Sequence, residues 1–307
     1  MVERSLHVLV TGAAGHLGSH LAPALQAEGY AVSAIDRVSA DALRVPVRCV
    51  DLNDAVGLRS VLEGVDLVVH CASIHPWKRY DDADYLRCNV QGAWALYTAI
   101  RQAGIRRVVL TSSIAAGGYG RIAPDSWPVS ESMQFPLADL YSFTKHAQED
   151  IARHFAETHG ITTWALRPPA FMPVSDPLTQ GGRLLGSYAV VDDMVSAHVA
   201  AVQALTELSA SHQMSAMEVI HTTTALPYTP ADAQEIGFQG DPLPLAQRYW
   251  PYATDWLVHH GYTPTWLAAV YDVRKAARLL NWRAACGFPE WFTQQTGRCP
   301  TTGEPLA

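Results

Sequence analysis

Tyr141 and Lys145 lie four residues apart and are the residues of this sequence best suited to chemistry. Residues i and i+4 share one face of a helix, where an ammonium group lowers the pKa of a neighbouring phenol. A phenol with a lowered pKa can exchange a proton with a substrate hydroxyl near neutral pH. The pair therefore indicates a tyrosine acid/base, although a solvent-facing helical pair would have the same spacing.

A glycine-rich segment near the N-terminus makes the interpretation more specific. Gly12, Gly15 and Gly18 follow a short apolar run and open a helical pattern. Such a turn lets a helix N-terminus approach a pyrophosphate. The alternative is an ordinary glycine-rich strand-to-helix turn, because the spacing is GxxGxxG and not GxGxxG.

Asp36 ends the second apolar run, where a carboxylate can accept hydrogen bonds from an adenosine ribose. The same charge repels a 2′-phosphate, so Asp36 favours NAD over NADP. Arg37 keeps NADP open as the alternative, since guanidinium groups pair with phosphates. Asp51 and Leu52, after the third run, are placed to offer a carboxylate and a backbone amide to adenine.

These residues stand at the ends of alternating strand and helix patterns. We predict strands at 6–10, 30–35, 47–51, 66–71, 107–113 and 162–166, and helices at 16–29, 89–104 and 140–160. Such alternation predicts a Rossmann-type α/β fold with a doubly wound parallel sheet. We expect a dinucleotide-binding domain over 1–166 and a smaller substrate-binding region over 167–307, with 190–222 returning to the sheet.

Composition narrows the class of protein. The 307 residues are 49% hydrophobic and 17% charged, which is typical of a compact chain with a sizeable core. The net charge of -7 argues against nucleic acid and anionic membranes as partners. Five scattered cysteines and the lack of a long apolar run predict a cytoplasmic protein with reduced thiols. The spacing of the thirteen histidines matches no zinc site, so we expect no metal.

In this order the motifs resemble the extended short-chain dehydrogenases/reductases, the NAD-dependent epimerase/dehydratase family. The matching segments, over about 190 residues, are Thr11–Gly18, Asp36, Asp51–Leu52, His70–Ser73, Asn89–Gly92, Ser112–Ser113, Tyr141–Lys145, Arg167–Pro168 and Val190–Asp193. From about residue 222 the resemblance continues only through Leu279–Trp282. The resemblance implies NAD as cofactor.

The resemblance also assigns roles at the reacting centre. Tyr141 becomes the acid/base, and Lys145 holds the nicotinamide ribose and lowers the tyrosine pKa. Ser113 positions the reacting oxygen, with Ser112 as the alternative. Asn89 stabilises the active-site helix or its water chain. The implied cofactor contacts are Gly12, Ala14, Gly15, His16, Leu17, Gly18, Asp36, Arg37, Asp51, Leu52, Cys71, Ala72, Ser73, Tyr141, Lys145 and Pro168.

Substrate contacts are expected from the loop that follows the fourth strand, because ligands bind at the carboxyl edge of such sheets. The predicted contacts are Ser73, His75, Ser113, Ile114 and Arg167. A substrate carboxylate or phosphate would meet Lys78, Arg79 or Arg167. For Lys78 and Arg79 the alternative is a solvated surface pair.

Two features limit the reaction and the substrate. Ile114-Ala115 stands where the sugar dehydratases of this family place an Asp-Glu pair, so dehydration is not expected. The segment between Pro168 and Asp192 is shorter than in the nucleotide-sugar enzymes. That favours a small substrate without a nucleotide, as in the family's uronate dehydrogenases.

We therefore predict an NAD-dependent oxidoreductase that transfers hydride between nicotinamide and a carbinol or carbonyl carbon of a small sugar-like substrate, such as a uronate or another anion. One alternative is a nucleotide-sugar epimerase with tightly bound NAD. Another is a non-catalytic dinucleotide-binding protein. The resemblance further implies a homodimer through helices 89–104 and 140–160, with Trp94, Tyr97 and Phe155 exposed on them.

Overall fold

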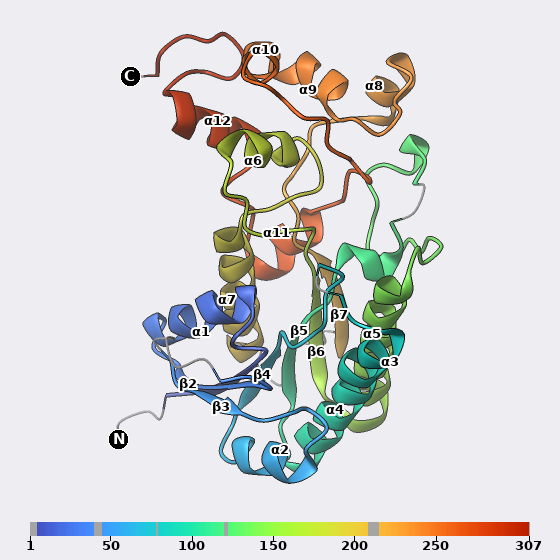
Figure 1. Ribbon diagram of the computed structural model, residues 1–307. Coiled ribbons are helices and arrows are strands. Elements are labelled where there is room, and N and C mark those ends of the chain that lie inside the picture. The colour runs from blue at the N-terminus through green and yellow to red at the C-terminus, as the bar shows by residue number, and fades with distance from the viewer. Residues whose placement is uncertain (1–4, 40–44, 78, 120–121, 208–214, 307) are drawn as a thin grey trace. The chain divides into compact units, whose positions relative to one another are not determined.

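The computed structural model describes residues 5–39, 45–77, 79–119, 122–207 and 215–306 (Figure 1). The chain divides into two compact units. The first contains residues 1–118, 137–167 and 195–220, and the second contains 119–136, 168–194 and 221–307. Residues 119–136, which the predicted boundary placed in the first domain, thus belong to the second unit.

A seven-stranded sheet, in the order β3-β2-β1-β4-β5-β6-β7, forms the centre of the first unit. The strands are β1 His7–Thr11, β2 Ala31–Asp36, β3 Val47–Cys49, β4 Leu67–His70, β5 Arg107–Thr111, β6 Thr162–Arg167 and β7 Met217–His221. All pairs from β3 through β6 are parallel. The predicted doubly wound sheet is confirmed, and the direction of winding reverses between β1 and β4.

Helices cover both faces of this sheet (Figure 1). They are α1 His16–Ala27, α2 Ala55–Val61, α3 Asp82–Tyr85, α4 Gly92–Gln102, α5 Leu140–His159 and α7 Val191–Glu207. A π-helix, Leu86–Gln91, leads directly into α4, and a 3₁₀ helix covers Ile114–Gly117. The predicted helix at 89–104 is therefore a π-helical turn followed by an α-helix.

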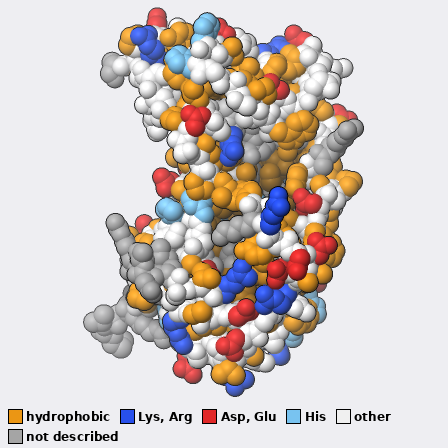
Figure 2. Space-filling model, in the orientation of Figure 1, with side chains coloured by type: hydrophobic (Ala, Val, Ile, Leu, Met, Phe, Trp, Pro, Cys, Tyr) orange, Lys and Arg blue, Asp and Glu red, His pale blue; other side chains and the backbone are white. Residues whose placement is uncertain are grey.

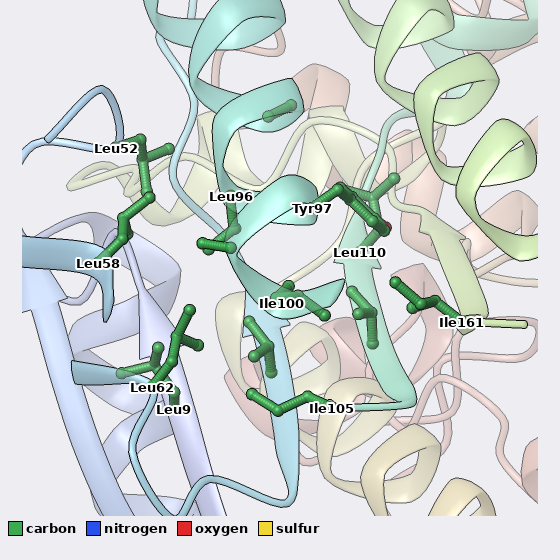
Figure 3. Packing of buried hydrophobic residues seen from close by; sticks show 14 of the residues in the cluster. Leu9, Leu52, Leu58, Leu62, Leu96, Tyr97, Ile100, Ile105, Leu110 and Ile161 are labelled. Atoms are coloured by element: carbon green, nitrogen blue, oxygen red, sulfur yellow. The ribbon is translucent and has the colours of Figure 1, made fainter. Parts of the chain in front are cut away.

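The core under α4 and α5 is built from apolar side chains of both helices and the strands (Figure 3). Leu96, Tyr97 and Ile100 of α4 are fully buried, and the Tyr97 hydroxyl lies 3.2 Å from Thr163 Oγ1. Phe155 of α5 belongs to the same cluster. The expectation that Tyr97 and Phe155 are exposed is wrong, because both face the sheet.

The second unit has an aromatic core of its own. Its helices are α6 Pro177–Leu184, α8 Pro230–Glu235, α9 Leu243–Tyr249, α10 Pro251–His259, α11 Arg274–Leu280 and α12 Phe288–Thr296, with a 3₁₀ turn at Pro124–Ser126. Phe288, Trp291 and Phe292 of α12 are buried. A Cβ at Gly181 of α6 would stand 2.2 Å from the Trp291 ring, so α6 and α12 touch through a glycine. The Trp-rich C-terminal sequence thus builds a core.

On the face shown in Figure 2, acidic and basic side chains are interspersed. All five cysteines are free thiols. Among the described residues, no helix combines the length and apolar character that crossing a membrane requires.

Candidate active site

The glycine turn after β1 is held by close packing. Gly12 has a φ of +69°, and a Cβ there would stand 2.6 Å from the Ala72 backbone. A Cβ at Gly18 would stand 2.3 Å from the Gly12 carbonyl oxygen. Gly15 is exposed, and its Cβ would meet only that carbonyl oxygen, at 3.1 Å. Internal packing therefore explains Gly12 and Gly18, and close approach of a ligand is the remaining reason for Gly15.

The same turn presents a helix N-terminus suited to an anion. Gly15 is the N-cap of α1, and no side chain caps the helix there. The first amide groups of α1 are thus available for phosphate oxygens. Leu17 is buried beneath the turn, whereas Ala14 and His16 are partly exposed at it.

Asp36 ends β2 beside the glycine turn. Its Oδ2 accepts a hydrogen bond from the Ala14 amide at 3.0 Å, and its Oδ1 accepts one from Val38 at 3.2 Å. A carboxylate held in this way keeps lone pairs for two ribose hydroxyls. Arg37 is exposed, donates to the Tyr80 hydroxyl at 3.0 Å and lies 5.4 Å from the centroid of that ring.

Asp51 and Leu52 follow β3 as predicted. Asp51 Oδ1 accepts a 2.8 Å hydrogen bond from the Asn53 amide, which lowers the pKa of this carboxyl group. Leu52 is buried against Gly92, where a Cβ would stand 3.1 Å from the leucine Cβ. The carboxylate of Asp51 therefore remains charged and half-exposed at the edge of the sheet.

Polar side chains join the carboxyl ends of β1, β4 and β5. Thr11 Oγ1 lies 2.8 Å from His70 Nδ1 and accepts from the Ala72 amide at 3.3 Å. Thr111 Oγ1 lies 3.3 Å from the Cys71 sulfur. Burial lowers the pKa of His70 to about 3 and raises that of Cys71 to about 11, so both groups are uncharged. Uncharged, hydrogen-bonded side chains thus line the carboxyl ends of these strands, where the winding of the sheet reverses.

Tyr141 and Lys145 lie in the first two turns of α5, which Asp139 caps by accepting from the Ser142 amide. Both side chains are buried, and Lys145 Nζ lies 6.0 Å from the centroid of the Tyr141 ring. Burial lowers the pKa of Lys145 to about 8. An ammonium so close to the phenol favours the phenolate.

Asn89, in the π-helix, connects the loop after β4 to helix α5. Its Oδ1 accepts from the Ile74 amide at 2.7 Å, and its Nδ2 donates to the Ile74 carbonyl and to Thr144 Oγ1. The side chain is fully buried and touches the loop after β4 and helix α5. This placement suits the predicted role of Asn89 in stabilising the active-site helix.

The two serines after β5 have different surroundings. Ser112 donates to Glu149 Oε1 at 2.5 Å. Ser113 caps the following 3₁₀ helix by accepting from the Ala115 amide at 3.2 Å. His146 Nδ1 lies 3.0 Å from the Ala116 carbonyl oxygen, which ties this helix to α5. Of the two, the hydroxyl donor of Ser113 is the one left for a substrate oxygen.

Arg167 makes a contact other than the predicted one. Its guanidinium binds both oxygens of Glu149, with Nε–Oε1 at 2.8 Å and Nη2–Oε2 at 2.7 Å. Both side chains are nearly inaccessible. Arg167 was predicted to contact a substrate anion; in the structure its Nε and Nη2 bind a buried carboxylate of the protein itself.

His75 contacts the ring of Tyr141. Its ring centroid is 4.6 Å from that of Tyr141 and 3.8 Å from that of Trp77. Burial lowers the pKa of His75 to about 4, and its buried Nδ1 has no hydrogen-bond partner among the described residues. An unpaired polar atom beside the Tyr141 ring suits a ligand hydroxyl.

The remaining predicted residues fall into three groups. Ser73 and Ile114 are partly exposed near Ile74 and Ser113. Pro168 is buried at the first position of the second unit's 168–194 segment. Lys78 lies outside the described residues, and Arg79 is exposed.

Gln148 and Glu149 are site residues that the motif analysis missed. Gln148 Oε1 accepts from Lys145 Nζ at 3.1 Å, and Glu149 binds Ser112 and Arg167. Their spacing from Lys145, i+3 and i+4, puts them on the same helical face. That spacing is the signal that could have identified them.

The fold is that of a dinucleotide-binding protein, and the buried pair of Tyr141 and Lys145 lies near the carboxyl end of β5. The model of the NAD dependent epimerase/dehydratase family matches residues 8–177, more than half of the sequence. This chain belongs to that family.

Several curated relatives are similar. Sterol demethylase protein B of Methylococcus capsulatus is 39% identical over 148 residues, 46% of this chain and 44% of that protein. The decarboxylating sterol-4-alpha-carboxylate 3-dehydrogenase of Bos taurus is 28% identical over 226 residues, 67% of this chain and 63% of that enzyme. Uronate dehydrogenase of Pseudomonas putida is 29% identical over 191 residues, 61% and 68% of the two chains. The chain thus spans less than two thirds of the first two relatives.

Among solved structures, MoeE5 in complex with UDP-glucuronic acid and NAD is similar, with a TM-score of 0.65 and 25% identity. The similarity covers 94% of this chain and 96% of that one. The similarity in fold therefore continues beyond residue 177, where the match to the family model ends.

Proposed function

We propose that this protein is an NAD-dependent oxidoreductase that transfers hydride between nicotinamide and a secondary carbinol or its carbonyl. The observation that carries the proposal is the buried pair of Lys145 and Tyr141, with the ammonium 6.0 Å from the ring centroid. When bound, NAD supplies the hydride acceptor. The residues of this chain then have to bind it, orient the alcohol and accept one proton.

The cofactor site fits NAD. The amides at the start of α1 would hold the pyrophosphate, and Asp36 would hold the adenosine ribose. The charge of Asp36 disfavours a 2′-phosphate, and Arg37 is engaged with Tyr80. MoeE5, of similar fold, was solved with NAD.

The residues near the reacting centre have distinct roles in this proposal. Tyr141 accepts the hydroxyl proton, and the Ser113 hydroxyl hydrogen-bonds the same oxygen. Lys145 keeps its charge in a buried site, lowers the pKa of the phenol and binds the nicotinamide ribose. His75 Nδ1 contacts a further substrate hydroxyl.

We propose a hydroxylated carboxylate as the substrate class, with a uronate as its sugar-like form. Two relatives are named for such compounds, a sterol-4-alpha-carboxylate and a uronate. The short segment from Pro168 to Asp192 supports a substrate without a nucleotide. With Arg167 bound to Glu149, Arg79 is the remaining described candidate in the loop after β4 for the carboxylate.

The experiment is a screen of uronates, carboxylated sterols, neutral sugars and UDP-sugars with NAD, followed by NADH absorbance. We expect NADH with a hydroxylated carboxylate. Formation of an epimer from a UDP-sugar, without net NADH, would overturn the dehydrogenase proposal. The family name favours this second candidate, an epimerase that keeps its NAD bound.

We also propose that the protein is cytoplasmic and forms a homodimer through α4 and α5. Five free thiols support a reducing compartment. Trp94 of α4 and Phe143 of α5 are each 49% exposed, which is unusual for large apolar side chains on neighbouring helices.

A further inference from the structure

The amide of Gln148 has a single possible orientation. Its Nε2 donates to the Asn89 backbone carbonyl at 3.0 Å, and its Oε1 accepts from Lys145 Nζ at 3.1 Å. The flipped amide would place NH₂ against the ammonium and the oxygen against a carbonyl. Because Gln148 is fully buried, water cannot relieve such a clash.

The carbonyl that orients Gln148 is itself rigidly placed. Asn89 lies inside the π-helix Leu86–Gln91, where i→i+5 bonding displaces carbonyl groups from the α-helical ladder. Both side-chain atoms of Asn89 are bonded, to Ile74 and Thr144. The chain of contacts therefore runs from the loop after β4, through Asn89 and Gln148, to Lys145.

Lys145 has three N–H groups and two acceptors among the described residues. One acceptor is Gln148, and the other is the Thr111 carbonyl at 2.9 Å, at the end of β5. The two acceptors fix the ammonium in space and leave one N–H for a ligand. The partner supplied by Gln148 is uncharged, so it orients the cation without neutralising it.

We propose that Gln148 is a positioning residue for the active-site lysine: its clamped amide holds the ammonium in place and keeps it protonated in a buried site. The lysine's task rests on the proposed function, whereas its protonation does not.

Several titratable groups also face Lys145. They are Tyr141 and Glu149 on α5, Cys88 in the π-helix, and His70, Cys71 and His75 at the end of β4 and just after it. The histidines and thiols have pKa values shifted toward their uncharged forms. Glu149 is already paired with Arg167. The Gln148 amide is therefore the polar contact that Gln148→Met can remove without adding a competing titration.

The test measures the protonation of Lys145 directly, without substrate or cofactor. The sequence contains only two other lysines, Lys78 and Lys275, so protein made with ¹³Cε-lysine gives a simple NMR spectrum. The signal that is present in the wild-type spectrum and absent from that of Lys145→Met is the signal of Lys145. In the wild-type protein, Lys145 should titrate with a pKa of about 8.

Two substitutions at Gln148 should shift this titration in opposite directions. Gln148→Met keeps the volume but removes the acceptor, and should lower the pKa of Lys145 by about one to two units. Gln148→Glu adds a negative charge beside the ammonium and should raise it. Gln102→Met, at the exposed end of α4, is the matched control and should leave the titration unchanged.

A purely structural Gln148 would lower the thermal stability of both variants without shifting the Lys145 titration. Unchanged values, or shifts in the same direction, overturn the proposal. If Gln148→Met fails to fold, Gln148→Glu still gives the direction in which the pKa of Lys145 shifts. With an active substrate, the alkaline limb of the kcat/KM profile should follow the NMR values. A protein that forms no NADH would contradict the proposed function and leave the NMR result standing.

Discussion

Glu149 of α5 and Arg167 at the end of β6 form a bidentate ion pair that is almost fully buried. Ser112, directly after β5, donates to the same carboxylate. The pair thus fastens the helix that carries Tyr141 and Lys145 to two strands of the sheet. The same pair engages the Arg167 guanidinium that was predicted to contact a substrate anion.

Breaking this pair should destabilise the protein. We expect Arg167→Met to cost about 3–5 kcal/mol of unfolding free energy, because it leaves a buried carboxylate unpaired. Arg153→Met removes the exposed partner of Asp150 on the same helix and should cost less than about 1 kcal/mol. Urea unfolding measures both. A stable Arg167→Met protein with only a raised KM would restore the substrate-binding role.

Tyr141→Phe should nearly abolish turnover, since the variant cannot accept the hydroxyl proton. NAD affinity should stay close to that of wild type, because the glycine turn and Asp36 are untouched. The absorbance of NADH measures turnover, and fluorescence titration with NAD measures cofactor affinity. Tyr30→Phe, whose hydroxyl only reaches Thr206 at 3.5 Å, is the control. Normal turnover by Tyr141→Phe would refute the assignment of the acid/base.

Asp36→Asn should weaken the preference for NAD. Loss of the carboxylate removes its repulsion of a 2′-phosphate, so the ratio of NADP to NAD affinity should rise by about tenfold or more. Adding Arg37→Ala should reverse part of that gain, since Arg37 would be the phosphate partner. Binding titrations with both cofactors measure the ratio. Tighter binding of NADP to wild type would contradict the predicted cofactor choice.

Acid should destabilise the protein through His70. Its folded pKa of about 3 lies below the ordinary value of 6.5, so the unfolded chain binds a proton first. This contribution to stability is complete above pH 6.5 and is lost as the pH falls toward 3. By pH 4.5 the loss should be about 2–3 kcal/mol.

His70→Asn keeps a polar side chain near Thr11 but cannot titrate in this range. Its unfolding free energy should therefore depend less steeply on pH between 6.5 and 4.5. The exposed His20→Asn should retain the wild-type slope. Denaturant titrations at several pH values give these slopes, and equal slopes for all three proteins would exclude His70 as the acid-sensitive group.

The proposed dimer can be tested at Trp94. Trp94→Glu places a charge on the outer face of α4 and should shift the mass toward that of the 33.5 kDa chain in light scattering. Val258→Glu, at another exposed apolar position, should not. A wild-type protein that already has the monomer mass would refute the interface.

The sheet and the position of Tyr141 and Lys145 were predictable because continuous apolar runs and glycine turns are local signals. The burial of Tyr97 and Phe155 was not. Helical spacing shows which residues share a face, but only packing against the sheet shows which face is inside.

Arg167 and Gln148 illustrate the limit for site residues. A sequence shows that an arginine follows a strand, yet its partner Glu149 is eighteen positions away and was not part of any motif. Gln148 becomes meaningful only when Asn89, on another element, orients its amide. Pairing between elements is a tertiary property that local patterns do not contain.

The contact between Gly12 and Ala72 has a mechanical consequence. No methyl group fits between them, so the turn after β1 and the loop after β4 are in direct backbone contact across the switch point. The spacing of these two segments is therefore incompressible. A bulkier residue at Gly12 would push the two segments apart and displace both the amides at the start of α1 and the loop that carries His75.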